Sequence, residues 1–320
     1  MRVDLGVACR ISAPTGGRRS RVAATVAAVT AVTAGSGLIA PAAAVAKNGR
    51  LAFPNASNLV LQPLTGAPSV IKDRRATIIG SSRSGRLMAL SSGTDGDVTI
   101  ADGRGRVIRR IDFRGIVIHS LDISPDGRRL ALTAFRDAEP GRLNLFPYVA
   151  DISGRGLTRV TTRLRHTFDL RFTRDGRAFV YAGAPTTGDF VACPSLRRVR
   201  LDGTRDTLLY EAVGGTLPCA LSFALSPAGN SAVFTGDPAP GQLPPPGTLV
   251  RTGVYQVALT GRATPRLLHP QAFAVAWAPD GDQVAFSSLA GTYRMRAGGG
   301  TATRVSPTPT LAMTWLKAAG

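Results

Sequence analysis

The sequence lacks the short motifs of the common hydrolase and metal sites. Gly-x-Ser-x-Gly, which exposes a nucleophilic serine on a tight turn, is absent, and the nearest string, GSSRSG from Gly80, has no glycine at its fifth position. His-Glu-x-x-His and Cys-x-x-Cys, spacings that hold zinc, are absent as well. No segment alternates strands with helices, so a separate α/β catalytic domain is not expected. The sequence therefore indicates no catalytic, metal-binding or cofactor-binding residues, and we expect no cofactor.

Concentrated runs of charge are also missing, although the chain is strongly basic. Its 39 Lys and Arg residues exceed its 20 Asp and Glu residues, and the formal net charge is +19. The arginines are scattered singly along predicted strands and turns, without a run of five and without interleaved aromatic residues. This distribution argues against nucleic acid as the partner, but it leaves an anionic polymer of the cell envelope open.

Charge is absent from one long stretch near the N-terminus. After several arginines, residues 22–46 are uncharged and weakly apolar, and they end in Ala44-Val45-Ala46. This order is typical of a secretory signal and predicts a signal peptide over residues 1–46, with cleavage before Lys47. Arg18-Arg19 leaves twin-arginine export open beside the general secretory route, and retention as a membrane anchor is the alternative. Without its five arginines and one aspartate, the mature chain would carry a formal charge of about +15.

What the sequence does contain is a repeated string. HSLDISPDGRRLALTAF, residues 119–135, returns as FDLRFTRDGRAFVYAG, LSFALSPAGNSAVFTG and FAVAWAPDGDQVAFSS. Each string alternates apolar and polar residues on both sides of a turn, which indicates a β-hairpin, because glycine tolerates the positive φ of a tight turn. The turn glycines lie 36 to 53 residues apart, a spacing that suits four-stranded blades with variable loops. They are Gly49, Gly85, Gly127, Gly176, Gly229 and Gly281.

The two ends of the repeat region complement each other. KNGRLAFPN, from Lys47, is a second strand without a first, and LAMTWLKAAG, from Leu311, is a first strand without a second. Together they complete one repeat, which predicts a blade shared between the N- and C-termini. Such a blade closes the ring and removes open sheet edges. We therefore predict an all-β fold over residues 47–320, a six-bladed β-propeller of four-stranded blades.

The repeated SPDG hairpins, each followed by a strand and a glycine-containing turn, resemble the TolB-like six-bladed β-propeller family with its WD-like repeat. The resemblance covers residues 47–320. The chain departs from the pattern in SSRSGRLMALSS, where Arg and Ser replace Pro and Asp, and at Ala228, which replaces the turn Asp. Both departures keep the glycine. The resemblance implies a scaffold for protein or ligand contacts, and it brings no catalytic residues to this sequence.

Cysteine is scarce, and its positions are informative. Cys9 would leave with the signal peptide, so that Cys193 and Cys219 remain. Cys193 falls in the long loop between the second and third strands of one blade, and Cys219 falls in the connection that enters the next blade. Because an oxidising compartment permits the bond, we predict a disulfide between Cys193 and Cys219.

Extra length gathers in the loops of one face. The loops after the second strands are long, as in GDPAPGQLPPPGTLVRTG, whereas the turns between third and fourth strands stay short. The three histidines each fall just before, or at the start of, a predicted first strand on that face. With two nearby arginines they predict a basic binding rim around the channel, made of Arg114, His119, Arg165, His166 and His269. Three imidazoles at a channel mouth could instead hold a metal, as in propeller lyases.

These observations favour an exported, single-domain propeller that acts by binding and not by catalysis. Two alternatives remain: a lyase- or lactonase-type enzyme with its site at the channel mouth, and a binder of anionic envelope polymers through the Arg-rich surface. The expected location is outside the cytoplasm, either secreted or in the periplasm or cell envelope. The expected partner is a protein or an envelope polymer, membrane contact would be peripheral at most, and we expect a monomer.

Overall fold

The computed structural model describes residues 49–55, 58–72, 76–136, 145–187, 190–191, 193–212, 217–220, 222–236 and 252–317. The predicted signal peptide, residues 1–46, lies outside them and stays a prediction. Most of the long loops also lie outside them, including the proline-rich loop. Within the described ranges, no helix is long and apolar enough to cross a membrane.

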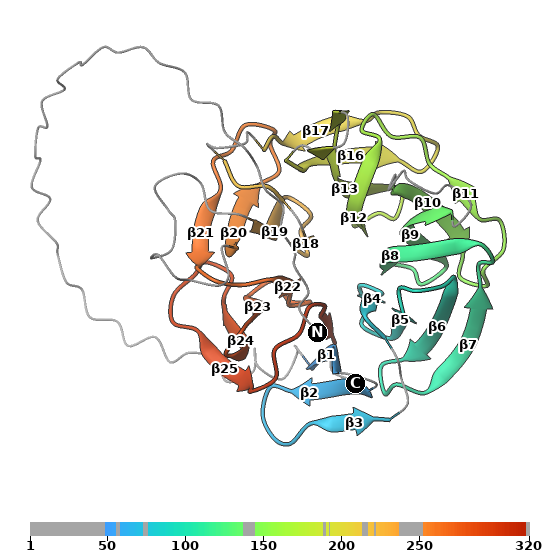
Figure 1. Ribbon diagram of the computed structural model, residues 1–320. Helices are drawn as coiled ribbons and strands as arrows, with labels where there is room; N and C mark the ends of the chain where they lie inside the picture. The colour runs from blue at the N-terminus through green and yellow to red at the C-terminus, as the bar shows by residue number, and fades with distance from the viewer. Residues whose placement is uncertain are drawn as a thin grey trace, which may run out of the picture. The chain divides into compact units, whose positions relative to one another are not determined.

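Six four-stranded antiparallel sheets form the blades of a ring (Figure 1). From the ring axis outward, the strands of each blade are called A, B, C and D. The A strands of successive blades contact one another all the way around, from β26 to β4, β8, β12, β18, β22 and back to β26. The predicted all-β, six-bladed propeller is therefore confirmed.

Each blade takes four strands of the chain, in the order A to D. Blades 1 to 3 contain β26 (Thr314–Leu316), β1 (Arg50–Asn55), β2 (Asn58–Pro63) and β3 (Ser69–Ile71); β4 (Ile78–Ser81), β5 (Leu87–Ser91), β6 (Asp97–Asp102) and β7 (Val107–Asp112); β8 (Ile116–Ile123), β9 (Arg129–Arg136), β10 (Phe146–Asp151) and β11 (Thr158–Arg159). Blades 4 to 6 contain β12 (His166–Phe172), β13 (Ala178–Ala184), β16 (Ser195–Arg200) and β17 (Thr207–Tyr210); β18 (Ser222–Leu225), β19 (Ser231–Gly236), β20 (Gly253–Ala258) and β21 (Arg266–His269); β22 (Ala274–Trp277), β23 (Gln283–Ser288), β24 (Gly291–Arg296) and β25 (Thr303–Ser306). A small hairpin, β14 (Thr186–Thr187) with β15 (Phe190–Val191), lies between strands B and C of blade 4.

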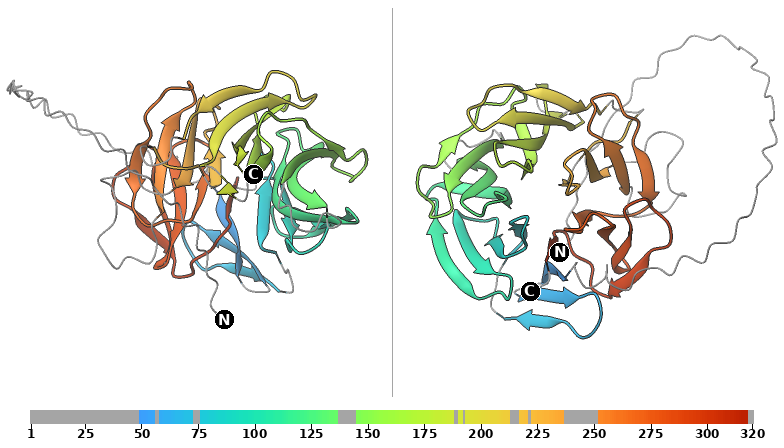
Figure 2. Two further views of the ribbon diagram at one scale, coloured as in Figure 1. Left: turned by 45° about the horizontal axis from the view of Figure 1, so that its top comes forward. Right: turned by 180° about the vertical axis from the view of Figure 1, so that it is seen from behind.

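The first blade is shared between the two ends of the chain, as predicted. β26 pairs antiparallel with β1, and the paired positions are Arg50 with Leu316, Leu51 with Trp315, and Ala52 with Thr314. The C-terminal strand thus lies beside the N-terminal one, and the shared blade closes the ring at this point (Figure 2).

The A-to-B turns explain why the repeated string keeps its glycine. All six turn glycines have φ between 63° and 90°, a region that residues with a Cβ rarely occupy. In blade 3 the Ser124 hydroxyl donates to the Asp126 carboxylate and accepts from the Arg129 N–H, while Asp126 also accepts from the Arg128 N–H. These side chains therefore satisfy the backbone donors of the turn.

The turns that depart from SPDG replace these hydrogen bonds with others. In blade 2 the Leu87 N–H donates to the Ser82 hydroxyl, and the Arg86 N–H donates to Ser84, which stands in the Asp position. In blade 5, where Ala228 replaces Asp, the Ser226 hydroxyl donates to the Asn230 side chain. The predicted tolerance of these departures has this physical basis.

The core consists of apolar clusters between neighbouring blades. The inner strands bury side chains of both faces against the adjacent sheets, the outer strands are largely exposed, and one cluster fills the interface of each successive pair of blades. Leu51 and Phe53 of β1, for example, pack on Ala274 and Ala276 of β22. This packing fixes the ring and leaves its two rims for contacts with a partner.

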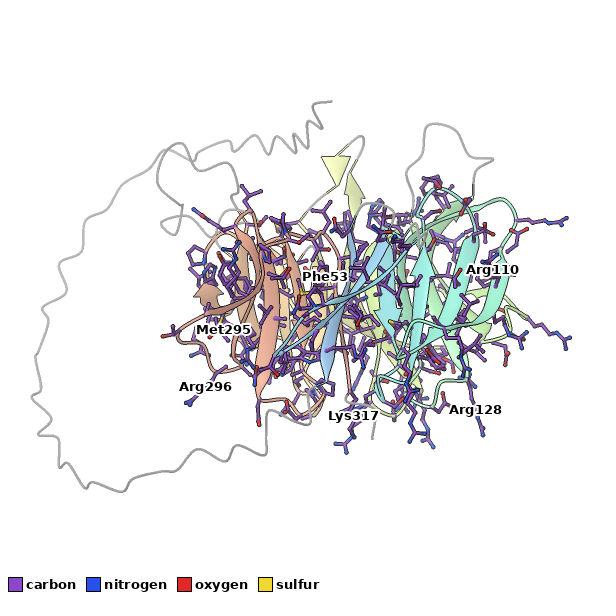
Figure 3. All side chains as sticks on the ribbon, turned by 90° about the horizontal axis from the view of Figure 1, so that it is seen from below. Phe53, Arg110, Arg128, Met295, Arg296 and Lys317 are labelled. Atoms are coloured by element: carbon purple, nitrogen blue, oxygen red, sulfur yellow. A yellow bond between two sulfur atoms is a disulfide. The ribbon has the colours of Figure 1, made fainter. Side chains whose placement is uncertain are left out.

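We call the two rims the turn face and the loop face. The turn face carries the A-to-B and C-to-D turns, and the loop face carries the B-to-C and D-to-A connections. Arg128, Arg296 and Lys317 lie together along one edge of the ring in side view (Figure 3). All three stand at the ends of strands that run into turns, so this edge is the turn face.

Candidate functional site

The two arginines of the predicted rim lie in D-to-A connections on the loop face. Arg114 is exposed between β7 and β8, and its Nε lies 3.3 Å from the Asp112 carboxylate. Arg165 is exposed directly before β12. The exposed ion pair of Arg114 contributes little to stability and is easily exchanged for another contact. Both guanidinium groups are therefore accessible to a partner.

The three histidines of the predicted rim occupy three different environments. His119 is the fourth residue of β8, is exposed, and has its Nδ1 2.9 Å from the Phe168 carbonyl oxygen of blade 4. His166 is the first residue of β12, is buried, and packs against the Phe168 ring in a tilted arrangement, with 4.3 Å between the ring centroids. His269 ends the outer strand β21 and packs on Phe286 at 4.4 Å, where burial lowers its pKa.

The expected placement at the start of an A strand is correct for His166 and wrong for His119 and His269. β8 begins at Ile116, because Ile116 already pairs with Arg136 of β9. His269 belongs to strand D of blade 5, and residues 270–273 separate it from β22. The three imidazoles therefore lie on the A strands of blades 3 and 4 and on strand D of blade 5. Among the described residues, no group of three His, Cys, Asp or Glu side chains is placed to hold a metal ion.

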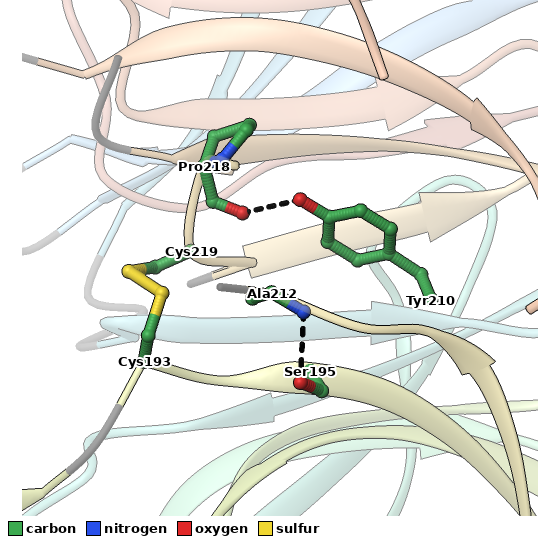
Figure 4. The surroundings of a disulfide bond; sticks show 6 residues. All are labelled: Cys193, Ser195, Tyr210, Ala212, Pro218 and Cys219. Atoms are coloured by element: carbon green, nitrogen blue, oxygen red, sulfur yellow. Dashed lines mark hydrogen bonds between the residues drawn. A yellow bond between two sulfur atoms is a disulfide. The ribbon is translucent and has the colours of Figure 1, made fainter. Parts of the chain in front are cut away.

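The predicted disulfide is present between Cys193 and Cys219, with Cα atoms 5.0 Å apart. It joins the loop before β16 to the connection between β17 and β18 (Figure 4). Nearby, the Tyr210 hydroxyl donates to the Pro218 carbonyl at 2.6 Å, and the Ala212 N–H donates to the Ser195 hydroxyl at 2.9 Å. The interface between blades 4 and 5 is thus fastened at its loop end.

A cavity of about 140 Å³ lies on the ring axis, between the A strands of all six blades. Asp122 of β8 lines it, and its carboxylate accepts the Phe172 N–H of β12 at 2.7 Å. Burial raises the pKa of Asp122 to about 7, and the neighbouring Asp169 adds to the rise, whereas the Arg171 guanidinium and backbone N–H groups oppose it. Asp122 therefore links two blades and carries a charge that is poorly solvated.

Three arginines line the same axial cavity: Arg83, Arg171 and Arg174. Arg171 is paired with Asp169 at 2.5 Å. Arg83 and Arg174 stand where the SPDG pattern has proline, and neither has an ion pair among the described residues. Partial burial and the Arg174 charge lower the pKa of Arg83. The turn end of the cavity is therefore flanked by two positive charges without carboxylate partners.

A larger hollow of about 1040 Å³ lies on the turn face between blades 4 and 5, and we call it the blade 4/5 groove. Its lining has an excess of four positive charges, because it contains six arginines and two aspartates. The charged residues are Arg129, Arg174, Arg177, Arg198, Arg200, Arg205, Asp175 and Asp202. None of the described lining residues is aromatic. Arg174, Leu225 and Gly229 line both the groove and the axial cavity, so the two hollows adjoin.

The groove exists because large side chains fill only one end of this interface. Toward the loop face, the two blades are packed by Leu196, Phe223, Phe234 and Tyr255. At the turn end the space between the blades stays open, and its lining includes the small residues Ala178, Ala228 and Gly229 together with Val180 and four leucines. A local change in residue size thus converts an apolar interface into a groove.

Strand β16 supplies the basic wall of the groove. Its sequence SLRRVR alternates, because successive side chains of a strand point to opposite faces. Leu196 enters the core between blades 4 and 5, and Arg198 and Arg200 follow on the same side, where both are exposed. Val199 points to the opposite side, into the cluster between blades 3 and 4.

The two aspartates of the groove are occupied by their own turns. Asp175 accepts from the Thr173 hydroxyl at 2.6 Å and from the Arg177 N–H at 3.1 Å. Asp202 accepts from the hydroxyl and the N–H of Thr204 at 2.6 and 2.9 Å. These hydrogen bonds lower the pKa of both carboxyl groups. The carboxylates therefore serve the turns, and the arginines stay available.

Sequence reasoning missed this groove, because its arginines are spread from residue 129 to residue 205 and look scattered along the chain. Two signals were available. Arg198 and Arg200 are two positions apart in one strand, and arginine replaces proline in SRSG and TRDG. Neither pattern shows by itself that the interface between blades 4 and 5 is open at one end.

No family model matches the sequence, and no curated protein matches it. Solved structures share the fold. TolB from Acinetobacter baumannii is 19% identical with a TM-score of 0.60, over 85% of this chain and 67% of that one. A nidogen/laminin complex is 12% identical with a TM-score of 0.60, over 83% and 98%. An oligogalacturonate lyase in complex with manganese is 13% identical with a TM-score of 0.52, over 78% and 70%.

The chain therefore has a TolB-like β-propeller fold, as the repeat pattern predicted. At such low identities the likeness concerns the fold alone. One of the three similar structures is named as an enzyme and another as a protein complex, and one fold can carry unrelated functions. Function has to be argued from the residues of this chain.

Proposed function

We propose that this chain is an exported propeller that binds an anionic partner. The observation that supports this proposal is the excess of arginine on the turn face, in the A-to-B and C-to-D turns and on β16. The exposed basic residues there are Arg83, Arg86, Arg104, Arg106, Arg128, Arg129, Arg155, Arg174, Arg177, Arg198, Arg200, Arg205, Arg262, Arg296 and Lys317. Among the described residues, only Arg106 of this set has an ion pair, with Asp102. A guanidinium fork matches phosphate and carboxylate groups, so such a surface favours anionic ligands.

Export is the part of the proposal that rests on the cysteines and the N-terminal pattern. Disulfides persist in oxidising compartments, and Cys193 and Cys219 are joined. A secreted, periplasmic or envelope location fits this bond. N-terminal sequencing of the exported protein should find a start near Lys47, and a full-length cytoplasmic product would contradict export.

Binding is favoured over catalysis by where the ionisable groups lie. A lyase- or lactonase-type site would need several of them to converge on a channel mouth. His166 is buried, His119 contacts a backbone carbonyl, and His269 lies on an outer strand. Asp122 is engaged with a backbone N–H of the next blade. We therefore propose a binding role, with a protein or an envelope polymer as the anionic partner.

Retention of residues 47–320 on an envelope fraction tests this role. The protein should be retained at about 50 mM salt and largely released at about 500 mM, because screening of exposed charges becomes much stronger between these two salt concentrations. Retention that is indifferent to salt would contradict an anionic partner.

The loop-face rim supplies the alternative surface within the same assay. The variant R114Q/R165Q removes two exposed arginines there, and R198Q/R200Q removes two from the turn face. We expect the turn-face variant to be retained less than the unmodified protein, and the loop-face variant to be retained as well as the unmodified protein. The opposite result would move the binding surface to the predicted rim of Arg114, His119, Arg165, His166 and His269.

A further inference from the structure

We infer that the blade 4/5 groove binds a linear phosphodiester polymer without bases, of the polyol-phosphate kind. This assignment rests on the proposed function, the binding of an anionic partner. It adds a specific site and a ligand class to that function. The observations that carry it are the size of the groove, its hydrogen-bonding groups, its lack of aromatic lining and its position beside the axial cavity.

Size favours an extended ligand. Pockets for small molecules measure about 300–1,000 Å³, and the groove, at about 1040 Å³, lies just above that range. A single small anion would leave most of it empty. The axial cavity, at about 140 Å³, has room for only one small group. A polymer segment that crosses the turn face can contact successive arginines in the groove.

The groove offers many hydrogen-bond donors and few free acceptors. Its six guanidinium groups only donate, whereas Asp175 and Asp202 already accept hydrogen bonds within their own turns. A matching ligand is rich in acceptors and poor in donors. A phosphodiester presents two non-bridging oxygens that share one negative charge per repeat, and this pair suits a guanidinium fork. A polyuronate carries more hydroxyl donors per charge than poly(glycerol phosphate), and the groove has few free acceptors for them.

The lining also argues against nucleic acid. Proteins that hold single strands stack the bases on aromatic side chains, each stack contributing on the order of 1–3 kcal/mol. The described lining residues of the groove include no aromatic ring. The groove would therefore contact only the charged backbone of a polymer and not its bases.

The course of the ligand follows from β16 and Arg174. Arg198 and Arg200 are two residues apart on one side of the strand, a separation of roughly 7 Å along it. They can therefore bind neighbouring phosphates of an extended chain. Arg174 lines both hollows and directs the polymer from the groove toward the ring axis.

The first test measures binding of fluorescent poly(glycerol phosphate) to the mature protein and to matched double variants. R198Q/R200Q should weaken binding by about tenfold or more, because hydrogen bonds to charged groups are lost. R114Q/R165Q removes the same charge from the loop face and should change binding less than about threefold. Equal weakening by both variants would show that net charge, and not the groove, binds the polymer.

A second pair of variants changes the groove with residues that other blades already carry. R174P introduces the proline found at the same turn position in blades 3, 5 and 6, and A228D introduces the aspartate found in blades 3, 4 and 6. Both should fold normally. We expect each to weaken poly(glycerol phosphate) binding, through a lost guanidinium and an added carboxylate. Unchanged binding in both would overturn the site.

Two further probes, polygalacturonate and an oligothymidine, test the ligand class at matched concentrations of charge. Tighter binding of either than of poly(glycerol phosphate) would overturn the phosphodiester assignment. If all three polymers fail while retention on the envelope stays salt-sensitive, the groove assignment is wrong and the proposed function stands. If salt-sensitive retention is also absent, the proposed function itself fails.

Discussion

Arg197 and Arg198 are neighbours in β16, and they meet opposite surroundings. Arg197 is buried toward blade 3, and its Nε donates to the Asp206 carboxylate at 2.7 Å. Asp206 also accepts from the Tyr181 hydroxyl at 2.6 Å and from the Arg163 N–H at 2.7 Å. Arg198 is exposed toward blade 5, and no ion pair to it is found in the described residues. One strand therefore presents a guanidinium paired with Asp206 on one face and an available one on the other.

The difference teaches that residue type does not decide the role of an arginine in this ring. On the blade 3 side, large side chains enclose the guanidinium, and a buried charge requires a partner. On the blade 5 side, Ala178, Ala228 and Gly229 leave room for water or a ligand. Packing of the neighbouring blade thus separates a stabilising arginine from one that can bind a partner.

The largest expected effect on stability comes from removing Asp206, the hydrogen-bond partner of Arg197. Asp206→Ala leaves the Arg197 charge buried and the Tyr181 hydroxyl without its acceptor, so the free energy of unfolding should fall by about 3–5 kcal/mol. Urea unfolding measures this loss. Asp202→Ala, an exposed aspartate of the same C-to-D turn, is the control and should cost about 1 kcal/mol or less. Equal losses in both variants would contradict the special status of Asp206.

A second buried carboxylate, Asp122, tests what happens without a bonded guanidinium. Its pKa of about 7 exceeds the unfolded value of about 3.9, so its contribution to stability is complete below pH 4 and is lost as the pH rises through 7. Asp122→Asn keeps an acceptor for the Phe172 N–H and removes the titration. Its stability relative to the native protein should rise between pH 5 and pH 8, by about 3 kcal/mol.

Urea unfolding of both proteins at the two pH values checks this expectation. The charged groups facing Asp122, Arg171 and Asp169, are present in both proteins, as are the histidines, so their titration cancels in the difference. A difference that does not change with pH would show that Asp122 titrates normally in the folded state.

The disulfide sharpens the comparison between the two ends of the blade 4/5 interface. Cys193→Ala/Cys219→Ala removes a cross-link between residues 26 apart, which should lower the free energy of unfolding by about 3 kcal/mol in the chain-entropy model. Thermal unfolding measures the loss. Because the bond lies at the loop end, binding by the groove should persist below the melting temperature. Loss of binding in a folded double variant would show that the two ends are coupled.

The smallest effect is expected from the available side of β16. R198Q/R200Q should change the free energy of unfolding by less than about 0.5 kcal/mol, because exposed substitutions that break no bond rarely do more. Urea unfolding of the double variant checks this. A marked destabilisation would mean that these arginines belong to the structure, and a marked stabilisation would indicate mutual repulsion in the groove.

The sequence was sufficient for the ring and insufficient for its site. The turn glycines, the shared blade and the Cys193–Cys219 bond were predicted, because each leaves a local pattern: a positive φ, a missing strand or a pair of cysteines in adjoining connections. His119 and His269 were misplaced, because strand boundaries depend on pairing between distant strands. The groove is lined by residues of different blades, such as Ala178 of blade 4 and Ala228 of blade 5, a relation that no single segment reveals.

The pairing of β1 with β26 also sets an order of events as the chain folds. β1 is among the first strands to leave a ribosome or an export channel, and its partner on the axial side follows only after all the other blades. Until then β1 presents an unpaired edge next to the growing ring, and contacts of such long sequence separation form late. Within the described residues, the seam that closes last has three residue pairs. A short peptide with the sequence of β26 could occupy that edge during synthesis and trap the ring open, by adding a strand to it.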